Sequence, residues 1–175
     1  MVLNYLRLLL FGLGLLVGLQ LPALVDQYAK RVDSHWREAQ QALAGFQANA
    51  DAHFDGDLQR LVAHYAASTD SVFRGDAHSI GQLLDRRQLL QAEMTALAGN
   101  SAARIWHLLW YADDAIRRQM LAQYSYTVPL TPDAILWALA VGLGLAWLVE
   151  LPLWLLLTLV RGQQLQRHSN YGGLR

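Results

Sequence analysis

Two long stretches without charge constrain this chain more than any other feature of its sequence. Leu8 to Val25 has no charged residue in 18 positions, and Ala134 to Val160 has only Glu150 in 27. As a helix, at about 1.5 Å of rise per residue, each is long enough to cross a hydrocarbon core roughly 30 Å thick. Their length and the near absence of a polar stripe argue against buried helices of a water-soluble core. The sequence therefore predicts two membrane-spanning helices.

The first apolar stretch has a competing interpretation, a secretory signal peptide. Met1 to Arg7 supplies a short positive start, and Leu8 to Leu19 supplies an apolar middle. The cleavage signal is poor, because Ala23 to Val25 ends in valine where a small residue should precede the cut, and Asp26 follows at once. The pattern favours an uncleaved membrane anchor.

The composition excludes several classes of function. The 175 residues are 54% hydrophobic and only 16% charged, which is more apolar than a typical soluble domain. The 14 basic and 14 acidic residues cancel, so nothing indicates nucleic acid as a partner. Cysteine is absent, which removes disulfides, thiolate catalysis and the common zinc sites. No P-loop, nucleophile elbow, dinucleotide fingerprint or paired-histidine motif is present. We expect no enzymatic activity, catalytic residue, metal or cofactor.

The distribution of charge predicts the orientation in the membrane. Between the apolar stretches, acidic residues outnumber basic residues 13 to 10, whereas the basic residues of the terminal segments have no acidic residue beside them: Arg7, Arg161, Arg167 and Arg175. Three basic residues soon after the first stretch oppose this asymmetry, but they are interleaved with acidic ones. Under the positive-inside rule both termini are cytoplasmic, and the middle is periplasmic in a Gram-negative-type cell.

The expected organisation follows from these boundaries. It comprises a cytoplasmic N-terminus (1–7), a first span (8–25), a periplasmic helical domain (26–133), a second span (134–160) and a cytoplasmic tail (161–175). The location is the bacterial inner membrane, and membrane lipid is a necessary partner.

The central segment shows helical spacing throughout. Apolar residues from Tyr28 to Ala50 mark one helix face, and we expect this helix to continue the first span across Pro22 and Asp26. A second, short helix begins at Leu58. The stretch Ser68 to Ala77 is rich in turn formers, so a third helix is expected only from about Ser79 to Ala98, and a fourth from Ser101 to about Met120. Such helices can close a small antiparallel bundle. The predicted fold is all-α, with two transmembrane helices enclosing an extracytoplasmic antiparallel helical bundle.

One acidic cluster has two interpretations. Asp51, His53, Asp55 and Asp57 could together hold a divalent cation. They lack the calcium-loop pattern, because no glutamate closes the loop at the right distance. A helix end followed by a capping turn explains the same residues, and we favour that interpretation.

A similar 11-residue motif occurs in both predicted spans. Residues 12–22 read GLGLLVGLQLP and residues 142–152 read GLGLAWLVELP, identical at six of 11 positions. The similarity is either a vestige of an inverted repeat, as in transporters, or a coincidence within the limited alphabet of membrane helices. In both cases Gly14 and Gly18 form a GxxxG spacing, and Gly142 and Gly144 leave a thin helix surface, so we expect these glycines at a helix contact.

Gln20 and Glu150 occupy the same position in the two copies of this motif. They lie roughly 19 Å and 16 Å of helix rise from the presumed cytoplasmic edge, so they could meet. A bare carboxylate in hydrocarbon is costly, which predicts that Glu150 is protonated or hydrogen-bonded, with Gln20 as the nearest candidate partner. The pair would be structural, within one chain or between chains, or it would carry protons or ions. A structural role is favoured because this membrane segment has no other ionisable group.

With these residues in view, the chain resembles a family of small proteobacterial membrane proteins known as domain of unknown function 2937. The resemblance rests on three segments: LQLPALVDQYAKRVDSHWREAQ, DLQRLVAHYAASTDSVF and PLTPDAILWALAVGLGLAW. It covers nearly the whole chain and implies a bacterial inner-membrane protein. The family brings no activity, so no site residue is carried over.

Three roles are compatible with this sequence. The first is a non-enzymatic assembly, scaffold or accessory subunit, either a homo-oligomer or part of a larger membrane-protein complex. The second is a receptor-like sensor whose periplasmic helices bind a ligand and signal through a partner. The third is proton or ion passage at Glu150.

Overall fold

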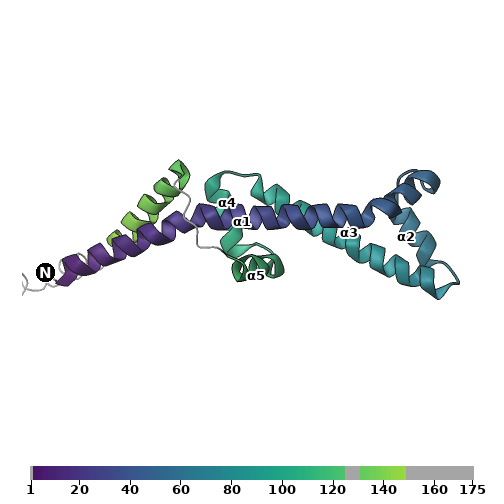
Figure 1. Cartoon of the computed structure of the whole chain (residues 1–175), viewed down its shortest axis with the longest axis horizontal. Coiled ribbons are helices and arrows are strands. Elements are labelled where there is room, and N and C mark those ends of the chain that lie inside the picture. Colours follow the sequence, from purple (N-terminus) through teal and green to yellow (C-terminus); the bar gives the residue numbers. More distant parts are fainter. Residues whose placement is uncertain (1, 125–130, 149–175) are drawn as a thin grey trace, which may run out of the picture. The chain divides into compact units, whose positions relative to one another are not determined.

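A computed structural model describes residues 2–124 and 131–148, and every regular element in these ranges is a helix. The five labelled helices in Figure 1 are α1 (Val2–His53), α2 (Leu58–Ala66), α3 (Ser71–Leu97), α4 (Ser101–Trp110) and α5 (Asp114–Ala122). A further helix, Pro132–Leu148, follows the gap. The predicted all-α class is confirmed for this part of the chain.

The chain divides into two compact units. One comprises Met1–Ala23 and Tyr126–Arg175, and the other comprises Leu24–Ser125. Helix α1 contributes its first part to the first unit and its remainder to the second, because it continues through Pro22 and Asp26 as predicted. We call these units the terminal unit and the central unit.

In the central unit, α3 runs antiparallel to α1. At one end, Ala50 of α1 and Leu58 and Leu61 of α2 form a buried cluster, against which Leu84 of α3 packs. At the other end, Glu93 of α3 bonds to Tyr28 of α1. Figure 1 shows α2 at the far end of α1, with α4 and α5 beside the middle of α1. Helices α1 and α3 are thus antiparallel in the central unit.

Side-chain caps fix where these helices begin. The side chains of four residues accept backbone N–H groups of the turn that follows: Asp57, Asp70, Asn100 and Asp113. Such caps satisfy donors that the first turn of a helix leaves free. The third helix therefore begins at Ser71, and the prediction of turns up to Ala77 was wrong. The Asp70 carboxylate accepts the Val72 N–H at 2.8 Å, and this cap outweighs the weak helix preference of the polar residues behind it.

The predicted fourth helix is in fact two helices. It stops at Trp110 and resumes at Asp114, so that Ala112, Ile116 and Met120 do not continue the face of α4. The physical reason is that the Asp113 backbone N–H leaves the helical pattern and donates to Tyr28 Oη at 3.0 Å. Its carboxylate then caps α5 by accepting from the Ile116 N–H.

Candidate functional site

Two helices of the terminal unit approach each other closely at glycines. An ideal Cβ on Gly14 would lie 2.6 Å from Gly142 Cα, and one on Gly18 would lie 2.5 Å from both Ala138 Cα and the Trp137 carbonyl oxygen. Contacts this short do not occur with a real side chain, so only glycine fits at these two positions. The two contacts run in opposite directions along the two segments, so the helices are antiparallel here.

Small residues line this crossing at regular intervals. Ala134, Ala138, Gly142 and Ala146 recur every four residues and are all buried. Gly142 has a neighbour of its own, because a Cβ there would lie 3.1 Å from the ring of Phe11. Gly144, predicted to pack with them, has open space within 4 Å where its Cβ would be. Three of the four predicted glycines therefore lie together, and Gly144 does not.

The predicted polar pair falls only partly within the described residues. Gln20 is partly buried on α1, two residues beyond Gly18. Glu150 lies outside the described residues. Because the helices are antiparallel at the crossing, residues 143–148 run from Gly142 toward the start of α1, whereas Gln20 lies on the other side of Gly18. A contact between Gln20 and Glu150 stays a prediction.

Large apolar side chains of the terminal unit face outward. On α1 these are Leu8, Leu9, Leu13, Leu16 and Val17, and on the other helix they are Leu136, Leu139, Leu143, Trp147 and Leu148. Leu16, for example, is 62% exposed. By length and composition, Asn4–His53 contains a stretch apolar enough to cross a membrane, and the apolar helix Pro132–Leu148 is shorter in the described range. The small residues are inside and the large apolar residues are outside.

A buried polar network lies in the central unit. Tyr28 is fully buried and Glu93 is 7% exposed. Tyr28 Oη donates to Glu93 Oε2 at 2.9 Å, and His107 Nε2 lies 2.7 Å from the same oxygen. An ionised carboxylate only accepts hydrogen bonds, so this imidazole nitrogen is the donor. Glu93 Oε1 accepts the Asp113 backbone N–H at 3.2 Å. These bonds join α1, α3, α4 and the start of α5.

An open groove of about 740 Å³ runs between α1, α2 and α3. Its lining includes half-buried Trp36 and Arg87 together with Asp85 and several glutamines. The side-chain amides of Gln40, Gln88 and Gln91 make no hydrogen bond to any described residue. The groove therefore offers one aromatic face and several free donors and acceptors to a polar partner.

The carboxylates of the acidic cluster at the end of α1 already bond to other groups of the protein. Asp51 accepts from the Gln47 amide at 2.8 Å, Asp55 pairs with Arg60 at 2.9 Å, and Asp57 caps α2. The turn between α1 and α2 adopts left-handed backbone angles at Asp55 and Gly56. Within the described ranges, no group of three or more histidine or acidic residues is arranged to hold a metal ion.

Comparison with known proteins gives one family. The family model described as "Protein of unknown function (DUF2937)" matches residues 2–162. The chain belongs to the DUF2937 family. Neither the search of curated proteins nor the search of solved structures gave a match. The membership confirms the resemblance inferred from the sequence.

Sequence reasoning missed the Tyr28–Glu93–His107 network of this DUF2937 protein. The spacing of apolar residues places Tyr28 on one helix face and assigns no role to Glu93 or His107. A usable signal was the position of Glu93, three residues after Leu90 and four before Leu97, which puts an acid on an otherwise apolar face. A charged residue in such a place needs a buried partner.

The network makes a prediction about alkaline pH. Burial, together with the hydrogen bond to the Glu93 carboxylate, raises the pKa of the Tyr28 hydroxyl well above its ordinary value of 10. The neutral hydroxyl then stabilises the fold fully below pH 10, and this stabilisation is lost as the pH rises further. We expect the wild-type protein to lose thermal stability above pH 10 more steeply than Tyr28→Phe.

Tyrosinate absorbance provides the control for that comparison. The chain has seven tyrosines, and Tyr28 should not ionise while the protein is folded. The folded wild type and Tyr28→Phe should therefore titrate alike, and one extra tyrosinate should appear in the wild type on unfolding. A folded wild type that gains one more tyrosinate than the variant near pH 10 would contradict the buried hydrogen bond.

Proposed function

We propose that this protein is a non-enzymatic assembly subunit of the bacterial inner membrane, anchored by the first part of α1 and by the segment that begins at Pro132. Both termini would be cytoplasmic and the central unit periplasmic. The observation that carries the membrane anchorage is the inverted arrangement of the terminal unit, with glycine and alanine at the helix contact and leucine outside.

Small residues at the helix contact and large apolar residues on the outer surface are stable in lipid but not in water. Exposed apolar surface costs about 25 cal/mol per Å² in water, so a water-soluble protein would bury these leucines. In a bilayer that cost disappears, and helices associate through close van der Waals packing of small residues. The side chains at the crossing and on the outer faces both meet this expectation.

The groove of the central unit supports a role in assembly. Its free amides and the Trp36 ring provide hydrogen bonds and contact area for a polar protein surface, and the buried network holds α1 and α3 in fixed positions on either side. The same groove is the place where a small polar ligand would bind if the protein were a sensor. The molecule that binds in the groove therefore distinguishes the two roles: a protein partner indicates assembly, and a small polar ligand indicates sensing.

Membrane placement is tested with cysteine labels, because the natural chain has no cysteine. Gly75 is exposed on α3 with open space around its Cβ position. In intact cells, after permeabilisation of the outer membrane only, Gly75→Cys should react with a membrane-impermeant maleimide. Gly172→Cys in the tail should react only after the inner membrane is opened. The protein should also stay with the membrane pellet after alkaline carbonate washing.

Opposite labelling of the two cysteines, or release of the protein by carbonate, would contradict the placement. Assembly is tested separately by native mass measurement of the full-length protein extracted from membranes. We expect complexes heavier than the 19.6 kDa monomer. A monomer that is stabilised by a small polar molecule, with the effect lost in Trp36→Ala, would instead favour sensing.

A further inference from the structure

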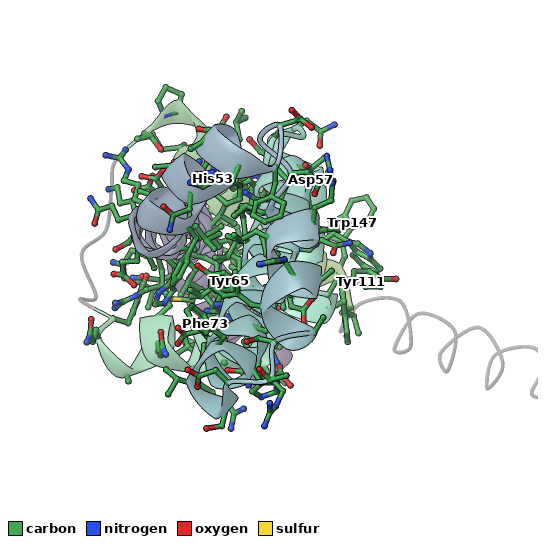
Figure 2. All side chains as sticks on the ribbon, turned by 90° about the vertical axis from the view of Figure 1, so that its right-hand side faces the viewer. His53, Asp57, Tyr65, Phe73, Tyr111 and Trp147 are labelled. Atoms are coloured by element: carbon green, nitrogen blue, oxygen red, sulfur yellow. The ribbon has the colours of Figure 1, made fainter. Side chains whose placement is uncertain are left out.

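Helix α4 is apolar on two opposite faces. Ile105 and Leu108 are buried in the central unit, whereas Trp106, Leu109 and Trp110 project on the other side. Trp106 is 59% exposed and Trp110 is 66% exposed, with their ring centroids 5.7 Å apart. The next residue, Tyr111, is 69% exposed, and Figure 2 shows its side chain pointing away from the surrounding helices. A contiguous apolar surface of this kind is normally covered by a partner or by lipid.

The buried network fixes the level of α4 along α1. His107 of α4 and the Asp113 backbone both bond into the Tyr28–Glu93 pair. Tyr28 lies three residues after Val25, where the charge-free stretch ends, or about 5 Å of helix rise. By the same measure Ala50, where α2 packs, lies roughly 37 Å beyond Val25. Helix α4 is thus held at the end of the central unit where the apolar stretch stops.

The outer face of α4 has the chemistry of a membrane–water interface. Tryptophan and tyrosine combine an apolar ring with one polar group, and they are enriched at the level of lipid headgroups. The polar groups of Trp106, Trp110 and Tyr111 bond to no described residue. The neighbouring α5 exposes Leu121 but has no aromatic residue, and its Arg117 pairs with Asp114. The aromatic surface is therefore specific to α4 and not a general property of this end.

We propose that the aromatic face of α4, defined as Trp106, Leu109, Trp110 and Tyr111, lies in the headgroup region of the bilayer that α1 crosses. The proposal rests on the membrane anchorage argued above. Lipid is the occupant that the position favours, because the face lies level with the end of the apolar stretch. The central unit would then be held against the membrane by α4 as well as by the helices that span it.

Spin labels at single cysteines test this in the full-length protein reconstituted in phosphatidylethanolamine–phosphatidylglycerol bilayers. Leu109→Cys places a label within the aromatic face without removing an aromatic ring. We expect its accessibility to oxygen, relative to a water-soluble nickel chelate, to be several-fold higher than that of Gln59→Cys on α2. Adding Trp106→Ala and Trp110→Ala to Leu109→Cys should lower this ratio toward the Gln59→Cys value.

Leu16→Cys, in the apolar part of α1, separates failure of this proposal from failure of the anchorage. A label at Leu16 that is reached by oxygen and not by nickel supports the anchorage. If the label at Leu109 is then as accessible to nickel as the label at Gln59, the α4 proposal is wrong. Shielding of Leu109 from both reagents would show a protein contact and would also overturn it. If the label at Leu16 is itself open to nickel, the membrane anchorage fails as well.

Discussion

Replacing Gly18 by leucine should separate α1 from the Pro132–Leu148 helix and lower the thermal unfolding temperature of the detergent-solubilised protein by about 6 to 12 °C. A Cβ at this position would lie 2.5 Å from Ala138 Cα and from the Trp137 carbonyl oxygen. The obstructing atoms are backbone atoms, which cannot rotate away. We therefore place the cost near 3 kcal/mol, the upper end of overpacking, and each kcal/mol shifts the midpoint by about 2 to 4 °C in a chain of this size.

Matched controls are available on the same two helices. Gly12 and Gly144 have open space where a Cβ would be, so Gly12→Leu and Gly144→Leu should change the unfolding temperature little. A disulfide between Phe11→Cys and Gly142→Cys reports the crossing directly, because a Cβ at Gly142 lies 3.2 Å from the Phe11 carbonyl oxygen. This disulfide should form in an otherwise wild-type chain and fail in Gly18→Leu. Equal behaviour of Gly18→Leu and Gly144→Leu would refute the crossing.

The second large effect is expected for Glu93→Ala in the central unit. This change leaves the Tyr28 hydroxyl, the His107 imidazole and the Asp113 N–H without the carboxylate that accepts from all three. Each buried donor that is left without an acceptor costs about 1 to 3 kcal/mol, so we expect a total loss of about 3 kcal/mol or more. Tyr28→Phe removes only one bond to the carboxylate and should cost about 1.5 to 3 kcal/mol. Both are measured by thermal unfolding of the full-length protein, monitored by near-ultraviolet circular dichroism.

Glu38 provides the control for Glu93. It too contacts a histidine, with its Oε2 3.1 Å from His35 Nδ1, but the Glu38 side chain is 65% exposed. Water can replace the lost bond there, so Glu38→Ala should leave the unfolding temperature close to that of the wild type. If Glu38→Ala and Glu93→Ala destabilise the protein equally, burial of the network is not what makes it important.

The all-α class and three glycines of the crossing, Gly14, Gly18 and Gly142, were accessible from the sequence because they depend on local patterns. The GxxxG spacing at Gly14 and Gly18 and the capping turn of the acidic cluster are each visible within a few residues of sequence, and in the structure Asp57 of that cluster caps α2. The split between α4 and α5 was not accessible. It depends on the Asp113 N–H reaching Tyr28, 85 residues away in the chain, and no local pattern encodes that contact.

The register of the helix crossing was also beyond local reasoning. The predicted depths of Gln20 and Glu150 are counted from Arg7 and Arg161, the arginines nearest each span, and equal depths require that those arginines lie at the same level. The contacts of Gly14 with Gly142 and of Gly18 with Ala138 define the alignment of the described residues instead. Flanking charges locate a membrane edge only approximately. A direct contact between glycine and the backbone of the other helix fixes the register of the two helices to one residue.

The Phe11 ring over Gly142 explains why this alignment is unique. Small residues every four positions would let one helix slide along the other by a single turn, since each step exchanges one small residue for the next. Of Ala134, Ala138, Gly142 and Ala146, only Gly142 lacks the methyl group that would collide with the ring, because a Cβ there lies 3.1 Å from it. The Phe11 ring thus fits at only one position of this periodic surface, and the two helices have one preferred register.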